Sequence, residues 1–566
     1  MQTAHGARAG RLAPLALALL ILLACLLASG CWQVYSNTWD EPEHLAAGLE
    51  LLDRGKYEYD TEHPPLARVL LALPPYLAGA RSFGTPPPEG TPEGIDILYS
   101  GGHYWRYLTL ARLGALPFLA LLLFVTWLWA QRLFARSYGA LLAVALLATV
   151  PPILGHAALA SLDVAAAAVI LLALYALQLW LSSGRSRDAA LFGLASGVAV
   201  ATKFSAVPFL ALSLPVLAIA RSVLARRAPA GAGAVARSRP GRWLGGLMLA
   251  VLAALVPLFL VYGPRAANPA GVALRFNWAV SYLQLMPGFS HGLGTLLAHL
   301  WLPRELKDVV NGIVAVKAHN DSGHLAYLLG RVASTGWWYF YLVALAVKTP
   351  IPLLVAAPPG LLGLAWRGWR ARDPWALAPL LLLVTLLVFA SSFSHINIGI
   401  RHVLILYPFM CLGAAWIAVA AWHGAAALKR PARLGARGVL LGLALWQVSC
   451  LWRAYPDYLP YFNEAVRDPQ YVLVDSDLDW GQDLYRLERR AAQLGIGSLS
   501  IAYRGTADLA REPLPPHQIL PPHRPVKGWV ALSALARTRN LSDYAWLNAY
   551  RPVERVGRSI DLYYIP

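Results

Sequence analysis

Three carboxylates and an imidazole crowd into five consecutive positions, from Asp40 to His44. They follow directly after the first long apolar stretch, although charged residues make up only 14% of the chain. Acidic groups so close to a stretch that can enter a bilayer are costly, and they are usually kept for a function. A carboxylate placed there can take a proton from a hydroxyl or an amine as a general base. We therefore expect Asp40 or Glu41 to be catalytic.

Further ionisable residues stand at the ends of other apolar stretches. Asp163 is the most informative, because a charge inside its alanine-rich run costs roughly 2.5–3.5 kcal/mol on insertion scales. Its alternative role is that of an ion-pair partner for a nearby arginine. Paired Lys and Arg donors suit a phosphate group, whereas each cation alone could simply reach towards lipid headgroups. The members of this group are Arg112, Asp163, Lys203, Lys348, Arg401 and His402.

The apolar stretches that position these residues predict a polytopic α-helical membrane protein. The 566 residues are 57% hydrophobic, with a mean hydropathy of +0.50. A soluble helical protein, the alternative, would rarely be so apolar, and several runs approach the roughly 20 residues that cross a bilayer. The predicted spans number about eleven: 12–31, 107–130, 138–155, 160–182, 189–202, 205–221, 243–262, 347–366, 374–392, 403–421 and 438–453.

Basic clusters between the spans set the predicted orientation. Alternating the spans puts every Lys and Arg cluster on one side, which the positive-inside rule makes cytoplasmic. The net charge of +18 therefore indicates membrane lipids as partners and no nucleic acid. Loops 32–106, with amphipathic helices, and 263–346 then face outward. The first span is interpreted as an uncleaved signal-anchor, although Ala28-Ser29-Gly30-Cys31 resembles a lipoprotein cleavage site.

The last part of the chain, residues 456–566, has more charge and no long apolar run. We predict a small extracytoplasmic α/β domain here, following a membrane domain over residues 1–455. Alternation and β-branched content indicate strands near 471–474, 498–503, 528–532 and 560–565, with an amphipathic helix over 480–494. In the acidic run 475–483, Asp477 or Asp479 is expected to cap a helix, because the glycine and the final glutamate of a calcium loop are misplaced.

Six motifs follow one another over about residues 10–455: Trp39-Asp40-Glu41-Pro42-Glu43-His44, Glu62-His63-Pro64-Pro65-Leu66-Ala67, Asp163, Lys203, Lys348-Thr349-Pro350 and Gly399-Ile400-Arg401-His402. In this order they resemble the GT-C glycosyltransferases. The nearest likeness is to family 39, the branch with protein O-mannosyltransferases and the lipid A aminoarabinose transferase. The resemblance implies a polyprenyl-phosphate sugar as donor, inversion at the anomeric carbon, and a GT-C fold.

The resemblance also implies roles for individual residues. Asp40 would be the base, and Glu41 would assist or orient it. Asp163 would shape the acceptor or metal side. The donor phosphate would be held by Arg112, Lys203 and Arg401, with Lys348 a weaker candidate. The set of substrate-binding candidates is completed by His402, Glu62 and His63.

The nature of the acceptor and the need for a metal stay open. A glycolipid, a polysaccharide or a protein could accept the sugar at the outer face of a bacterial inner membrane. The C-terminal α/β tail differs from the β-trefoil of the protein mannosyltransferases, which counts against a protein acceptor. Glu62, His63 and His44 could hold a divalent cation, but their loose spacing is a weak metal pattern. We expect no required cofactor.

Three other functions remain as alternatives. A lipid-linked glycan polymerase or ligase would use the same kind of site. A transporter or flippase should instead place its polar residues near the bilayer midplane, in two related halves. An envelope assembly or binding protein would need no catalytic carboxylate. The collection of polar residues at one face favours an enzyme.

Overall fold

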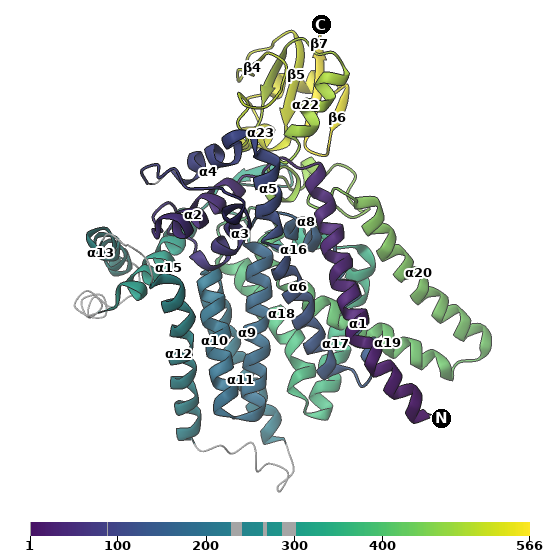
Figure 1. The fold of residues 1–566 in the computed structure, drawn as a ribbon. Helices are drawn as coiled ribbons and strands as arrows, with labels where there is room; N and C mark the ends of the chain where they lie inside the picture. The colour runs from purple at the N-terminus through teal and green to yellow at the C-terminus, as the bar shows by residue number, and fades with distance from the viewer. Residues whose placement is uncertain (1, 88, 228–239, 264–268, 286–301) are drawn as a thin grey trace.

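A bundle of long helices carries a small β-sheet at one end (Figure 1). The computed structural model describes residues 2–87, 89–227, 240–263, 269–285 and 302–566. Helices α2 to α5 gather at the same end as the sheet, and the N-terminus lies towards the opposite end. We call the end with α2 to α5 and the sheet the sheet end of the bundle.

Nine helical segments among the described residues are long and apolar enough to cross a membrane, which confirms the predicted polytopic fold. The first two are compound: Leu12–Gln33 joins α1 (Gln2–Ser29) to η1 (Gly30–Gln33), and Tyr104–Leu133 joins α5 (Tyr104–Leu113) to α6 (Leu116–Leu133). Five single helices follow: α9 (Asp163–Ser183), α11 (Ala206–Arg226), α12 (Pro240–Tyr262), α17 (Ile351–Ala371) and α18 (Pro374–Phe393). The last two are Leu406–Ala427, which joins α19 (Leu406–Gly424) to η4 (Ala425–Ala427), and α20 (Arg430–Ala454).

The predicted count of about eleven differs from the structure at two segments. Helices α7 (Ser137–Ala148) and α8 (Pro151–Ala157) meet at a 65° bend, because a proline pair follows Val150, which is extended. Counted as one bent span, they raise the total in the described part of the chain to ten. Helix α10 (Ser186–Thr202) has 17 residues, at the lower end of the length that crosses a bilayer, and is not among the nine segments.

Helix α10 lies tightly between α9 and α12 (Figure 1). A Cβ atom at Gly193 would lie 2.1 Å from the carbonyl oxygen of Ala250, and one at Gly197 would lie 2.2 Å from that of Ala254. Small residues allow membrane helices to approach in this way. Since α9 and α10 run side by side in opposite directions, the start of α9 and the residue after α10 meet at the sheet end.

Short helices cover the sheet end of the bundle. Helices α2 (Glu41–Arg54) and α3 (Pro65–Leu77) correspond to the two amphipathic helices expected in the first loop, and α4 (Gly90–Tyr99) adds a third. A proline pair expected to end the second helix lies inside α3. The remaining elements before the tail are α13 (Pro269–Leu285), α15 (Arg304–Ser322), β1 (Ala326–Leu328), β2 (Arg331–Ala333), α16 (Phe340–Lys348) and η3 (Ile400–Val403).

The tail forms a five-stranded sheet of order β4-β3-β5-β7-β6. Strand β3 pairs in parallel with β4 and β5, and β7 pairs antiparallel with β5 and β6. Three of the four expected strands are confirmed; residues 471–474 are not a strand, because the turn η5 (Pro469–Tyr471) begins at a proline. The elements are α21 (Asp475–Leu478), α22 (Leu484–Gln493), β3 (Leu499–Ala502), β4 (His517–Ile519), β5 (Gly528–Ser533), α23 (Ala534–Arg539), η6 (Ala545–Ala549), β6 (Glu554–Val556) and β7 (Ile560–Ile565).

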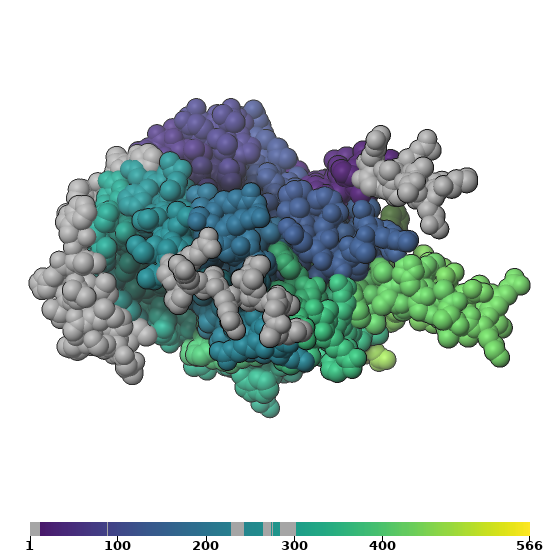
Figure 2. All heavy atoms as spheres, turned by 90° about the horizontal axis from the view of Figure 1, so that it is seen from below, coloured from purple at the N-terminus to yellow at the C-terminus, as the bar shows by residue number. Residues whose placement is uncertain are grey.

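The first part of the tail packs into the core of the helix bundle. Tyr458, Leu459, Leu473 and Trp480 are buried in the same hydrophobic cluster as the membrane helices. Seen from the end opposite the sheet, the region of α19 and α20 projects beyond the main body (Figure 2). The core is thus continuous from the bundle into residues 458–480, and this continuity places the acidic run 475–483 next to the sheet end.

Candidate active site

Four of the expected site residues form one chain of ion pairs. The Oδ2 atom of Asp40 lies 2.6 Å from Nη1 of Arg401. The same Nη1 lies 3.7 Å from Oδ2 of Asp163, and Oδ1 of Asp163 lies 2.6 Å from Nζ of Lys203. Two carboxylates and two cations from distant parts of the sequence therefore meet at one place.

Each of the four residues stands at a helix end. Asp40 is the N-cap of α2, and Asp163 is the first residue of α9. Lys203 directly follows α10, and Arg401 lies in η3, just before α19. A carboxylate at a helix N-terminus and a cation at a C-terminus are each stabilised by the helix dipole. The packing of α9 against α10 therefore brings a favourably placed carboxylate and a favourably placed cation together.

The four side chains differ in their access to solvent. The side chain of Asp163 is 2% exposed and that of Arg401 is 9% exposed, whereas Lys203 reaches 18% and Asp40 26%. A substrate can therefore contact Asp40 and Lys203 without rearrangement of the core. Asp163 contacts both cations from the buried side and fixes their separation.

Arg401 is held by the C-terminal tail. Its guanidinium lies 4.3 Å from the ring centre of Trp480, a cation–π contact. Although burial lowers its pKa, the charges of Asp40 and Asp163 raise the pKa of Arg401 above its ordinary value. Its buried Nε atom has no hydrogen-bond partner among the residues that the structure describes, and a buried donor without an acceptor is costly. An oxygen atom of a ligand would satisfy this donor.

The backbone around Arg401 fits closely against the tail. A Cβ atom at Gly399, whose φ is +145°, would lie 2.1 Å from Oγ of Ser476. The N–H of Ile400 donates to Oδ1 of Asp477 at 3.1 Å. The sequence predicts only a helix cap for the acidic run. It does not predict the contact of Trp480 with Arg401 or the hydrogen bond from Ile400 to Asp477.

Glu41 and Arg112 form a buried pair outside the open part of the site. Glu41 accepts hydrogen bonds from Nε and Nη2 of Arg112, both at 2.8 Å, and each side chain is 1% exposed. Glu41 also accepts from the backbone N–H groups of Thr38 and Ala160. Each donor nitrogen of Arg112 is thus engaged within the protein, and its expected role in phosphate binding stays a prediction. Its further bonds to the carbonyls of Tyr35 and Ser36 position the segment that carries Asp40.

Lys348, the weaker candidate for phosphate binding, also has partners within the protein. It is fully buried, and its Nζ donates to the carbonyl oxygens of Leu459 at 2.8 Å and Asp477 at 2.6 Å. The same atom lies 4.4 Å from the ring centre of Phe462. Burial lowers the pKa of Lys348 to about 8. This lysine attaches the tail to the bundle and does not face the open part of the site.

His402 lies beside Arg401 but contacts a different element. Its Nδ1 atom is 3.2 Å from the hydroxyl oxygen of Tyr341, at the start of α16. Burial lowers the pKa of His402 well below its usual range, and the charge of Arg401 lowers it further. A neutral His402 is thus a structural neighbour of the charged residues.

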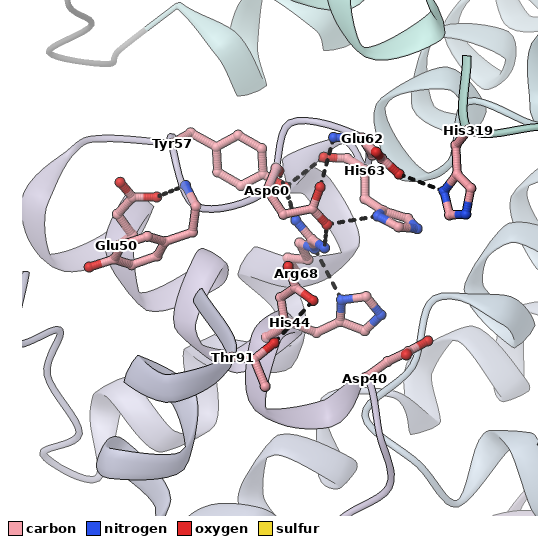
Figure 3. Close-up of polar contacts among 12 residues, drawn as sticks. Asp40, His44, Glu50, Tyr57, Asp60, Glu62, His63, Arg68, Thr91 and His319 are labelled. Carbon is pink, nitrogen blue, oxygen red and sulfur yellow. Dashed lines mark hydrogen bonds and ion pairs between the residues drawn. The ribbon is translucent and has the colours of Figure 1, made fainter. Parts of the chain in front are cut away.

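Glu62, His63 and His44 surround Asp40 on the loop side (Figure 3). Glu62 contacts Nδ1 of His319 at 3.0 Å, and His63 contacts Oδ2 of Asp60 at 2.8 Å through Nδ1. The Nδ1 atom of His44 accepts a hydrogen bond from Nε of Arg68 at 3.1 Å. Figure 3 shows the two rings, 5.6 Å apart, between Asp40 and the Glu62–His319 pair.

These contacts bear on the divalent cation left open above. Each of the three side chains already has a partner elsewhere, and no group of three or more His, Cys, Asp or Glu side chains arranged to hold a metal occurs in the described residues. Burial, with the positive charge of Arg68, lowers the pKa of His44 well below its usual range. Whether the protein needs a metal stays a prediction for experiment.

Fold and site together define a polytopic helical membrane protein with a charged centre at one end of its bundle. Residues 17–258 match the family model described as dolichyl-phosphate-mannose-protein mannosyltransferase. This match covers less than half of the chain, and it agrees with the resemblance noted in the sequence. No curated protein sequence matches the chain.

Two solved structures resemble the chain more distantly. The first is ArnT from Cupriavidus metallidurans bound to undecaprenyl phosphate, at 14% identity and a TM-score of 0.44, with 96% of this chain and 97% of that one covered. The second is the oligosaccharyltransferase of Archaeoglobus fulgidus in its apo form, at 14% identity and a TM-score of 0.44, covering 80% and 56%.

Proposed function

We propose that this glycosyltransferase moves a sugar from a polyprenyl-phosphate donor to an envelope acceptor, with inversion and with Asp40 as general base. The observation that carries the proposal is the chain Asp40–Arg401–Asp163–Lys203, with two cations beside an accessible carboxylate. The family match supports sugar transfer within a membrane. The site residues stand at span ends, where the phosphate of a lipid donor would lie.

The proposed reaction is a single displacement at the anomeric carbon. The acceptor oxygen or nitrogen forms a bond to that carbon, and the bond between the carbon and the phosphate oxygen breaks. Its electron pair goes to the phosphate, and the acceptor proton goes to Asp40. Attack from the side opposite the phosphate inverts the anomeric configuration.

The charges of the site match this displacement. The donor is a phosphate diester with one negative charge, and the released polyprenyl phosphate approaches two. Arg401 and Lys203 can stabilise the added charge because both contact Asp163 and therefore lie side by side. The unpartnered Nε of Arg401 offers a donor that Asp40 does not use.

The same reasoning supports an extracytoplasmic site in a bacterial inner membrane. The four residues lie at the sheet end of the bundle, whereas the basic segments after α6 and α17 lie at the other end. Under the positive-inside rule the basic end is cytoplasmic. The acceptor would then be a glycolipid, a polysaccharide or a protein outside that membrane.

The proposal is tested with the full-length protein in liposomes. A set of radiolabelled polyprenyl-phosphate sugars is incubated with an envelope extract, and Asp40→Asn is compared with the exposed control Asp468→Asn. Since a general base contributes roughly 10²- to 10⁴-fold, we expect Asp40→Asn to lower transfer by at least about 100-fold and the control to act as wild type. Equal transfer by Asp40→Asn would overturn the base assignment, and lipid movement without new glycosidic bonds would indicate a flippase.

A further inference from the structure

We propose that Asp475 and Arg539 of the C-terminal tail form an acceptor subsite that binds one hydroxyl group beside the catalytic centre. The inference rests on the proposed function and names a part of the acceptor. Both residues line one small cavity between the β1–β2 hairpin and α23, together with Leu325, Tyr327, Val332 and Thr538. Its volume of about 10 Å³ suits one water-sized group.

Asp475 differs from the other acidic residues of its run. Asp477 accepts from Ile400, Asp479 accepts from Leu535 at the start of α23, and Asp483 accepts from Ser559. The sequence predicts an N-cap at Asp477 or Asp479, but the N-caps of α21, α22 and α23 are Val474, Asp483 and Ser533. Asp475 has only the N–H of its neighbour Ser476 as a hydrogen-bond donor. Among the described residues its carboxylate forms no ion pair, so it is available to a ligand.

Arg537 has partners within the tail, whereas Arg539 has none among the described residues. Arg537, two positions earlier on α23, contacts the carboxylate of Asp561 at 3.2 Å and also the hydroxyl of Tyr563. Within the described part of the chain, Arg539 forms neither a hydrogen bond nor an ion pair, although it is only partly exposed. A guanidinium group only donates hydrogen bonds, so Arg539 can bind an oxygen atom from outside the protein.

The cavity lies beside the segment that leads to Arg401, because Oγ of Ser476, the residue after Asp475, donates to the carbonyl oxygen of Ile398, and Asp477 accepts from the N–H of Ile400. Burial raises the pKa of Asp475 to about 6, while the charges of Arg401 and Arg539 lower it and that of Asp40 raises it. Burial and the charges of Arg539 and Arg401 lower the pKa of His324, whereas the charge of Asp40 raises it. His324 directly precedes Leu325 of the cavity wall.

The backbone at Asp475 does not by itself require an aspartate. Its φ is +38°, in the left-handed region where glycine is favoured. A glycine would adopt this conformation at lower cost, so the carboxylate has a use other than making the turn. Strained residues of this kind are often found where a ligand is bound.

A hydroxyl fits the two residues better than a charged group does. A carboxylate only accepts hydrogen bonds and a guanidinium only donates them, whereas a hydroxyl does both. A hydroxyl can therefore donate to Asp475 and accept from Arg539. Asp475 would repel an anion, and Arg539 would repel an ammonium group. The structure thus assigns the acceptor to hydroxyl-bearing compounds, such as a glycan.

The test measures acceptor and donor affinity separately, with the full-length protein in liposomes. Asp475→Asn, Asp475→Gly and Arg539→Gln are assayed for transfer from a radiolabelled polyprenyl-phosphate sugar to increasing amounts of envelope extract. Arg372→Gly is the control for a glycine at a left-handed position, since Arg372 has a φ of +56° at the end of α17. Arg551→Gln is the control for loss of an exposed arginine of the tail.

We expect the three subsite variants to need at least about tenfold more extract for half-maximal transfer, at an unchanged half-saturating donor concentration. This factor corresponds to the loss of one hydrogen bond to a charged group. Asp475→Gly should melt no lower than wild type, so that its weaker acceptor binding is not due to unfolding. An unchanged extract dependence, or an equal loss of donor affinity, would overturn the subsite. Absence of transfer by wild type would instead contradict the proposed function, and the subsite with it.

Discussion

Asp40 and Arg401 are joined by a 2.6 Å contact although 361 positions separate them in the sequence. Arg401 also approaches Asp163, which binds Lys203. The proposed base and the proposed phosphate-binding cations thus belong to one electrostatic unit. A substitution at one of the four residues is therefore expected to change the electrostatic environment of the other three.

Variants of the Asp163–Lys203 pair should show separate effects on stability and on activity. Lys203→Met leaves a buried carboxylate with fewer partners, and breaking a buried pair costs about 3–5 kcal/mol. The double variant Asp163→Asn with Lys203→Gln removes both charges and should regain part of that stability. We expect it to remain at least about tenfold less active than wild type, because one phosphate cation is lost. Full activity in the stable double variant, measured by transfer and by thermal unfolding, would contradict the role of Lys203.

Trp480 should act on the donor side through Arg401. A cation–π contact contributes about 0.5–2 kcal/mol, so Trp480→Leu should raise the half-saturating donor concentration by up to about 30-fold. Trp480→Phe keeps an aromatic face and should recover most of the loss. The control is Trp452→Leu, since Trp452 is 81% exposed on α20. Equal losses in the Leu and Phe variants would show that Trp480 serves only to fill space.

Glu41 should be needed for folding more than for chemistry. Glu41→Gln leaves the buried guanidinium of Arg112 without its charged partner, at a cost of about 3–5 kcal/mol. We therefore expect a lower yield of folded protein and a lower melting temperature than for Asp40→Asn. Activity per folded molecule should fall less than in Asp40→Asn. A Glu41→Gln protein that is stable but inactive would instead make Glu41 a catalytic residue.

The contact between Glu62 and His319 should depend on pH. The hydrogen bond to Glu62 raises the pKa of His319 above its usual value. Its contribution is therefore complete below pH about 6.5, the pKa of an ordinary histidine, and is lost as pH rises through the higher folded-state value. Hydrogen exchange of residues 58–63 should be slower at pH 5.5 than at pH 8.5, after correction for intrinsic rates. The His319→Gln variant should lose this difference; if it keeps the difference, another group is responsible.

The sequence predicts the members of the charged centre better than it predicts their partners. Asp40, Asp163, Lys203 and Arg401 were all expected, because each stands where an apolar stretch ends and the orientation of the spans puts those ends on one side. The partner of a buried charge depends on packing between distant segments. Arg112 binds Glu41 from 71 positions away, and Lys348 binds Asp477 from 129.

In the tail, too, the sequence predicts local elements better than contacts between distant segments. Strands β3, β5 and β7 follow from local patterns of apolar and β-branched residues, whereas the packing of Trp480 on Arg401 has no local signal. The short strands β4 and β6 have only three residues each, too few for a pattern. The span expected over residues 189–202 corresponds to α10, which is slightly longer, at 17 residues.

The contacts of the tail also bear on the order in which the protein is made. The N–H of Ser36 donates to the carbonyl of Gln482, and that of Trp39 donates to the carbonyl of Trp480. A nascent chain therefore carries Asp40 and Arg401 in the membrane before the segment that holds both of them has been synthesised. For the proposed function, the site is therefore complete only after the tail has closed on the bundle, and we expect a chain that lacks the tail to be inactive.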